Sequence, residues 1–141
     1  MGALTLAQAN RIVAGAFEQA KESGYAPMAV AVLDAAGHVT SAQRADGASM
    51  FCIDVATGKA WASVAMGANS RVLAERAKGN PNFFVSLAST AQGRFLAQTG
   101  AVLITEAGGH VIGAVGASGG SGDEDEAICI AGVSAAGLAN R

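Results

Sequence analysis

Apolar residues recur at helical spacing near the start of the chain, at Leu6, Ala9, Ile12, Val13, Ala16, Phe17 and Ala20. This pattern predicts an amphipathic helix. Thr5 and Gln8 have the spacing of a capping box, in which each side chain binds the backbone amide of the other residue. Gly24 suits the position just after a helix, and Pro27 prevents the helix from continuing.

The following segment predicts a β-hairpin. Residues 28–33 form a short apolar run typical of a strand. Alternate side chains of this strand are expected to point to opposite faces of the sheet. Residues 34–37 end in a glycine and favour a turn. Residues 38–44 are therefore expected to return as the second strand, and residues 45–49, which are small and polar, to form a loop.

The middle of the chain predicts three helices. The first covers residues 51–69 and the second residues 71–78. A sharp break follows at residues 79–81, where Asn80 is a good N-cap and Pro81 a good first helical residue. A further short helix is then expected to bury the face formed by Phe84, Leu87, Ala88 and Ala91.

The last third predicts strands followed by a closing helix. Strands are expected at residues 94–97, 101–105 and 110–117, with a hairpin turn at Gly108 and Gly109. After a loop at residues 118–122, residues 123–138 read as a helix. Asp123 and Glu126 have capping-box spacing at its start.

This order of elements indicates an α+β fold, in which helices cover an antiparallel sheet. A doubly wound nucleotide-binding fold is not expected, because the strands do not alternate singly with helices. At 141 residues, the chain matches one ordinary domain spanning residues 1–141.

Composition narrows the class of protein. The formal net charge of −2 gives no basic footprint for nucleic acid. Only 14% of residues are charged, against about 25% in a typical domain, and 51% are hydrophobic, which favours a homo-oligomer that buries apolar surface. No apolar run reaches the roughly 18 residues of a membrane helix, and no secretory leader is visible, so a cytoplasmic protein is expected unless a precursor was trimmed.

A glycine-rich run at residues 113–122 lies between a predicted strand and a predicted helix. Such a loop can bind phosphate, but four acidic residues follow at 123–126 and would repel it. These acids have two interpretations. They can cap the helix and complement its dipole, or Asp123 and Glu126 can form a cation site, since hard metals take oxygen ligands.

Arg44, Asp46 and Lys59 form a second group of candidates. Lys59 interrupts an apolar helix, so it is expected either to pair with Asp46 or Asp54, or to bind a ligand carboxylate together with Arg44. In an enzyme, Asp46 or Glu126 would be the residue that moves protons.

The two histidines, His38 and His110, each follow a hairpin turn. Such positions are usually exposed, yet these are the strong nitrogen ligands that the chain offers to haem iron. Cys52 and Cys129 are expected to be buried, inert thiols, because no CxxC pair suggests zinc or redox chemistry.

Several segments together resemble the GlcG/HbpS-like (haem-degrading) family: residues 26–38, 44–48, 58–61, 111–119 and 125–127. The resemblance implies a profilin-like fold with a five-stranded antiparallel sheet, assembly into octamers, and haem as a possible cofactor. It also implies a pocket at Arg44, Asp46, Lys59 and the loop with Gly116, Ser118 and Gly119. The chain departs from the family's Gly-Gly-x-Pro-Ile motif at residues 99–104, where the proline is absent and Ala101 replaces the second glycine.

Three functions remain open at this level. The first is a haem-binding or haem-processing protein, in which Ala- and Gly-faced strands let a flat ligand lie close to backbone. The second is a small catabolic enzyme for an organic-acid or aromatic carboxylate substrate. The third is a non-catalytic oligomeric accessory protein, so whether the chain is an enzyme is undecided.

Overall fold

The computed structural model describes residues 2–141, and within them the chain forms five helices around one five-stranded antiparallel sheet. The strand order across the sheet is β2-β1-β4-β3-β5. In chain order the elements are α1 (Leu6–Ser23), β1 (Ala29–Asp34), β2 (Val39–Arg44), α2 (Phe51–Met66), α3 (Ser70–Gly79), α4 (Pro81–Thr90), β3 (Ala101–Thr105), β4 (Val111–Ser118), α5 (Gly122–Ala135) and β5 (Ala139–Asn140).

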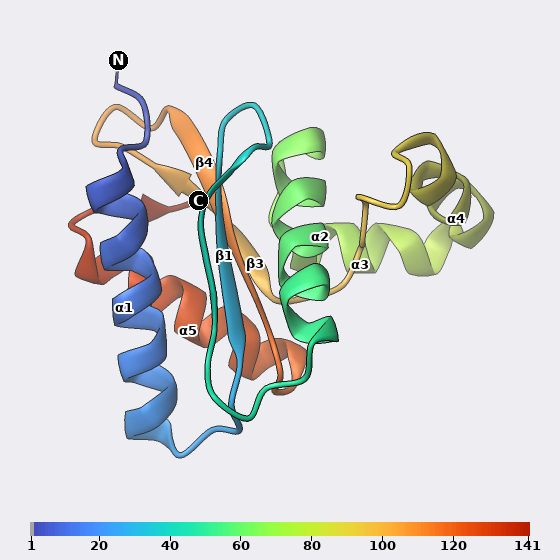
Figure 1. The fold of residues 1–141 in the computed structure, drawn as a ribbon. Helices are drawn as coiled ribbons and strands as arrows, with labels where there is room; N and C mark the ends of the chain where they lie inside the picture. The colour runs from blue at the N-terminus through green and yellow to red at the C-terminus, as the bar shows by residue number, and fades with distance from the viewer. Residues whose placement is uncertain (1) are drawn as a thin grey trace.

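Two helices cover one face of the sheet. In Figure 1, α1 and α5 lie side by side against it, and their buried apolar side chains form the larger core with residues such as Val30, Val32 and Val115. The two helices approach closely, since a β-carbon on Gly132 would lie 2.4 Å from the carbonyl oxygen of Ile12. The glycine therefore sets the spacing of this layer.

Helix α2 covers the opposite face, and α3 and α4 extend beyond the sheet (Figure 1). Ala56 and Ala60 of α2 pack on Ala29, Ala31 and other small residues of the central strands. A β-carbon on Gly116 of β4 would lie 2.2 Å from the carbonyl oxygen of Ala56, so this helix needs a glycine beneath it. Small residues on both sides thus bring the polar groups of α2 close to the sheet and its loops.

The structure confirms the α+β prediction with a five-stranded antiparallel sheet. It also confirms the first helix and its capping box, because the Gln8 amide donates to Thr5 Oγ1 at 3.1 Å and the Thr5 amide donates to Gln8 Oε1 at 3.0 Å. None of the helices over residues 2–141 is long and apolar enough to cross a membrane.

The predicted strand at residues 94–97 is wrong. These residues form no strand, because Arg94 turns back to donate from Nε to the Ala91 carbonyl and Phe95 packs into a cluster with Phe84. The fifth strand is instead β5, which pairs with β3 at the edge of the sheet. It lies beyond the end of α5, where Gly137 takes the left-handed conformation with φ of 73°.

The start of α5 also differs from the prediction. Its N-cap is Ser121, whose Oγ accepts from the Glu124 amide at 3.1 Å, while the Ser121 amide donates to Glu124 Oε1 at 2.9 Å. The capping box predicted at Asp123 and Glu126 is therefore displaced by two residues. Asp125 remains in the first turn of α5, and its side chain is buried.

Candidate functional site

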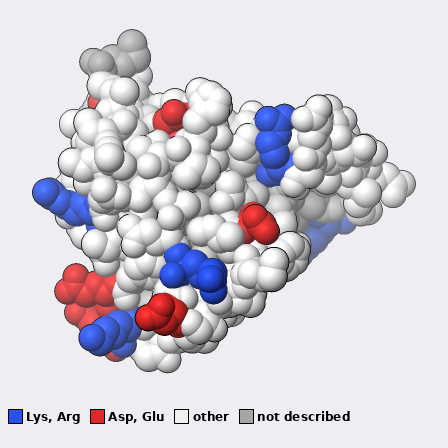
Figure 2. All heavy atoms as spheres, viewed as in Figure 1, with Lys and Arg blue, Asp and Glu red and all other residues white. Residues whose placement is uncertain are grey.

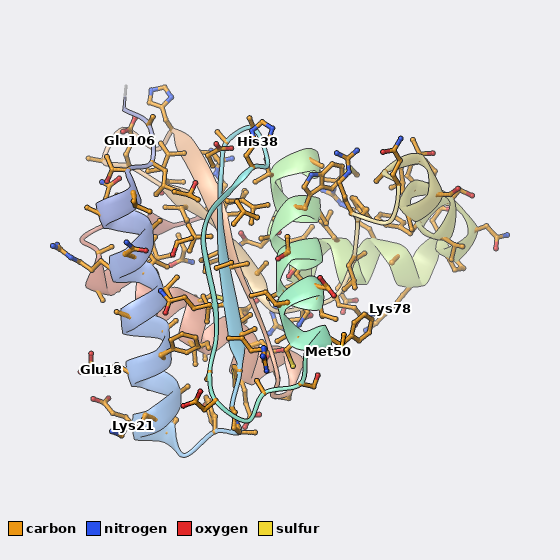
Figure 3. All side chains as sticks on the ribbon, viewed as in Figure 1. Glu18, Lys21, His38, Met50, Lys78 and Glu106 are labelled. Carbon is orange, nitrogen blue, oxygen red and sulfur yellow. The ribbon has the colours of Figure 1, made fainter. Side chains whose placement is uncertain are left out.

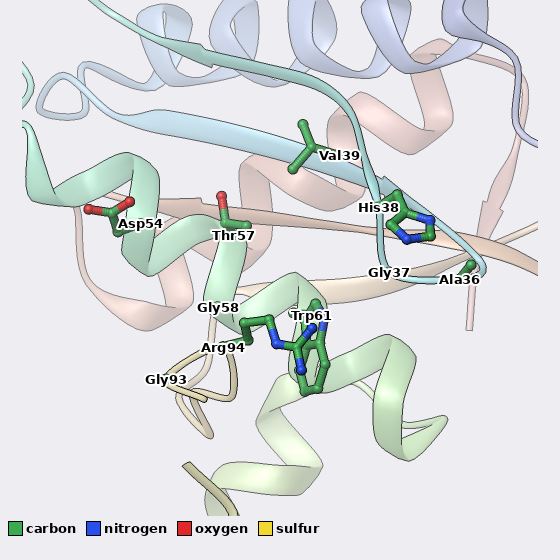
Figure 4. A pocket seen from close by; sticks show the side chains of 10 residues that line it. All are labelled: Ala36, Gly37, His38, Val39, Asp54, Thr57, Gly58, Trp61, Gly93 and Arg94. Carbon is green, nitrogen blue, oxygen red and sulfur yellow. The ribbon is translucent and has the colours of Figure 1, made fainter. Parts of the chain in front are cut away.

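A pocket of about 580 Å³ is an open hollow beside α2. Figure 4 shows its wall formed by the β1–β2 turn, one side of α2 and the segment after α4. Three chemically distinct side chains line it, namely the imidazole of His38, the indole of Trp61 and the guanidinium of Arg94. The pocket therefore combines a nitrogen ligand, a flat apolar surface and a cation.

The β1–β2 turn positions His38. Asp34 holds this turn, because its Oδ1 accepts hydrogen bonds from the amides of Ala36 at 2.9 Å and His38 at 3.0 Å. The same oxygen lies 3.8 Å from His38 Nδ1, and the His38 side chain is 80% exposed. The turn therefore presents an exposed imidazole at the edge of the pocket.

Arg94 lies over the Trp61 ring, with its guanidinium carbon 4.7 Å from the ring centroid. This cation–π contact and the hydrogen bond from Arg94 Nε to Ala91 fix the guanidinium at the pocket wall. Gly58 leaves room for the segment after α4 to pack against α2, because a β-carbon on Gly58 would lie 3.1 Å from the Leu96 β-carbon. The remaining guanidinium nitrogens are available to an anionic group.

A second pocket, of about 490 Å³, lies where α2 meets the start of α5, and it contains a buried ion pair. Lys59 Nζ is 2.9 Å from Asp125 Oδ2 and donates to the Ala117 carbonyl at 3.0 Å. Asp125 Oδ1 accepts from the Gly120 amide at 2.9 Å. Burial raises the pKa of Asp125, and the hydrogen bond and charge of Lys59 oppose that rise.

Comparison with known proteins identifies the family. The model of the family described as haem degrading protein HbpS-like matches residues 4–134. The chain belongs to the HbpS-like family. Among curated proteins, none matches the chain.

Solved structures agree with this family assignment. A complex of PduOC with haem superposes with a TM-score of 0.87 at 27% identity, covering 99% of each chain. A double mutant of Streptomyces reticuli HbpS gives 0.81 at 30% identity over 95% of this chain and 87% of that chain. Klebsiella pneumoniae protein ORFY gives 0.85 at 25% identity over 95% of this chain and 90% of that chain.

The residues behind the HbpS-like resemblance do not gather at one point. Lys59 pairs with Asp125, so the predicted partner, Asp46 or Asp54, is wrong. Arg44 donates from Nη1 to the Ala48 carbonyl at 2.7 Å within its own loop. Asp46 lines a different hollow, with Lys21 and Tyr25.

The candidate loop residues Gly116, Ser118 and Gly119 also have different surroundings in the structure. Ser118 lines the second pocket. Gly116 instead packs beneath α2, and a β-carbon on Gly119 would lie 2.5 Å from the Pro27 carbonyl oxygen. The two glycines therefore serve close backbone packing, whereas the serine faces the space where a ligand could bind.

Asp123 and Glu126, the candidate metal ligands, both bind Arg71 of α3. Their hydrogen bonds and charges raise the pKa of the Arg71 guanidinium above its ordinary value. Within residues 2–141, no three His, Cys, Asp or Glu side chains form a group able to hold a metal ion. A cation at this pair of carboxylates would have to compete with Arg71.

Sequence reasoning missed Trp61, Arg94 and Asp125 as site residues. Asp125 carried a signal, because it lies three and four residues before Ile128 and Cys129 and so shares the buried stripe of α5. Arg94 carried none, since its approach to Trp61 depends on how the loop after α4 folds back. His110 is exposed after the β3–β4 turn and does not line the pocket with His38.

Proposed function

We propose that this chain binds haem in the open pocket beside α2, where His38 would hold the iron. The observation that carries the proposal is an exposed imidazole at the rim of a hollow of about 580 Å³ that also contains Trp61 and Arg94. Membership of the HbpS-like family and the likeness to a haem complex of PduOC support it.

The residues present fit the chemistry of a haem. His38 would supply an imidazole nitrogen to its iron, and the Trp61 side chain would offer an apolar surface to its flat ring. Its propionates suit the guanidinium of Arg94, which is held over Trp61. When bound, haem would supply a redox-active iron, while this chain would supply the ligand, the orientation and the anchoring charge.

His38 is favoured over His110 because of its surroundings. His38 Nδ1 lies 3.8 Å from Asp34 Oδ1. The preceding residue, Gly37, runs past Trp61, since a β-carbon on Gly37 would lie 3.2 Å from Trp61 Nε1. His110 follows an exposed turn, where a β-carbon on Gly108 would touch its ring. Of the two histidines, His38 is the one that lines the hollow of about 580 Å³.

A haem titration followed in the Soret region tests the proposal. The unaltered chain is expected to saturate at one haem per chain, and His38→Ala to lose saturable binding. His110→Ala is the matched control and is expected to titrate like the unaltered chain. A linear, featureless titration of the unaltered chain would overturn the proposal, as would equal binding by His38→Ala.

We also propose that the chain works as a homo-oligomer, with an octamer as the state implied by the family resemblance. Charged side chains are sparse on the face seen in Figure 2, and large apolar side chains are exposed, with Met50 at 80% and Phe51 at 67%. Figure 3 shows Met50 and His38 near opposite ends of α2, so association through Met50 would leave the haem pocket open. Light scattering after size exclusion tests the assembly, and a monomer would contradict it.

A further inference from the structure

The second pocket is separate from the proposed haem pocket, although both use α2. Val55 and Lys59 line the second pocket, whereas Asp54, Thr57 and Trp61 line the first. In a helix, residues four apart share a face, so Val55 and Lys59 both face the second pocket rather than the first. Its opposite wall is the Ser118–Gly122 loop and the start of α5.

The Lys59 ammonium lines this pocket, and one of its N–H donors has no acceptor within residues 2–141. An ammonium has three N–H donors. Two of them reach Asp125 Oδ2 and the Ala117 carbonyl, and the hydrogen bonds among residues 2–141 include no third acceptor. Lys59 is only 5% exposed, and the exposure that it keeps is at the pocket that it lines.

Backbone packing fixes the position of this ammonium. Gly100, with φ of +135°, lies directly behind it, and a β-carbon there would be 2.6 Å from Lys59 Nζ. The Gly100 carbonyl in turn accepts from the Ala117 amide at 2.9 Å. The donor is thus held in place before any ligand arrives.

The charges around the pocket favour an uncharged ligand. Asp125 neutralises Lys59 at 2.9 Å, and Asp123, also in the lining, pairs with Arg71. A carboxylate or phosphate would gain one ammonium but would lie beside two carboxylates in a partly desolvated space. A carbonyl oxygen can accept the third N–H without that repulsion.

Four further polar residues line the pocket: Ser121, whose Oγ accepts from the Glu124 amide, and Gln98, Thr99 and Ser118. Within residues 2–141, the side chains of Gln98, Thr99 and Ser118 make no hydrogen bond to another part of the chain. The two hydroxyls can each donate and accept, so they match a ligand hydroxyl. The pocket therefore offers a fixed donor and adaptable hydroxyl partners, the usual composition of a small polar site.

We propose that this pocket binds a small uncharged compound that carries neighbouring carbonyl and hydroxyl oxygens. Its carbonyl accepts the third N–H of Lys59, and its hydroxyl bonds to Ser118 or Thr99. The proposal is independent of haem binding, because none of its residues lines the pocket with His38.

Lactamide and lactate provide the probe, since they have the same shape and differ in charge. With the haem-free chain, lactamide is expected to shift the backbone ¹⁵N–¹H signals of Ser118, Gly120 and Gly122 in a saturable way, with a Kd on the order of millimolar for so small a molecule. Signals of Gly37 and Gly58, in the other pocket, should not move. Lactate is expected to bind about tenfold or more weakly.

Two variants identify the donor. Lys59→Met combined with Asp125→Leu removes the ion pair without leaving a lone buried charge, and lactamide binding should disappear. Ser118→Ala, which changes no contact of the core, should weaken binding about threefold or more. Thr57→Ala, on the haem-pocket side of α2, is the control and should bind normally.

Several results would overturn the proposal. Lactate binding as tightly as lactamide would show that the site takes anions. Unchanged lactamide shifts in both the double variant and Ser118→Ala, or shifts that rise linearly without saturation, would show that Lys59 and Ser118 form no site. Because no haem is present, these results leave the haem proposal untouched.

Discussion

Lys59 and Asp125 form a buried ion pair, 2.9 Å between Nζ and Oδ2, although 66 residues separate them in sequence. The pair joins α2 on one face of the sheet to α5 on the other, at the end of β4. Gly100 and the Gly120 amide complete its surroundings. This contact fixes the Ser118–Gly122 loop and so shapes the second pocket.

Lys59→Met is expected to lower the free energy of unfolding by about 3–5 kcal/mol, because it leaves the buried Asp125 carboxylate without its partner. Adding Asp125→Leu should recover most of that loss, since the unpaired charge is then removed. Urea denaturation of the two single variants and the double variant measures the coupling. Additive losses in the double variant would contradict a direct pair.

Gly100→Ala is expected to destabilise the fold by about 2–4 kcal/mol, because its β-carbon would collide with Lys59 Nζ and because φ is +135°. Gly93→Ala is the matched control: φ is +79° there, but nothing lies within 4 Å of the added β-carbon. It should cost only about 1–2 kcal/mol. Equal losses for both variants, measured by urea denaturation, would show that the collision is relieved.

Local sequence patterns predicted most of the fold, and the errors of that prediction have physical causes. The helix at residues 6–23 and the strands at residues 29–34 and 101–105 follow apolar periodicity that packing then enforces. The strand predicted at residues 94–97 is absent because Phe95 is buried by a contact with Phe84 rather than by a sheet. Strand β5 has two exposed residues and no periodicity, so only its pairing with β3 defines it.

The candidate site was harder to predict because its contacts join distant segments. Lys59 was recognisable as an unusual charge in an apolar helix, but nothing local indicated which carboxylate it binds. Arg94 reaches Trp61 only because the chain turns back after α4. His38 was named from the sequence because it is a histidine after a hairpin turn, but its neighbour Asp34, four residues before it, was not.

The two cysteines are expected to differ in reactivity. Burial raises the pKa of the Cys129 thiol well above its usual range, whereas Cys52 is half-buried, contrary to the prediction that both thiols are buried. In the native chain, a thiol reagent such as dithiobisnitrobenzoate should modify Cys52 but not Cys129 at neutral pH. Cys52→Ser should abolish the native reaction, and a persistent reaction in that variant would show that Cys129 is accessible.

Arg94 is expected to recognise the propionates of haem. The unaltered chain should bind haem more tightly than haem dimethyl ester, because the ester lacks the carboxylates that a guanidinium binds. Since the pocket is open, the difference should be modest, about threefold. Arg94→Ala should bind both compounds alike in parallel Soret titrations, and a persisting difference would assign propionate recognition to another residue.

The most direct test of the account is a haem titration of His38→Gly with and without excess imidazole. We expect no saturable Soret change without imidazole and restored saturable binding with it, because free imidazole can take the place of the missing side chain beside Trp61. The same addition should leave the unaltered chain unchanged. Saturable binding by His38→Gly in the absence of imidazole would contradict the assignment of His38 as the iron ligand.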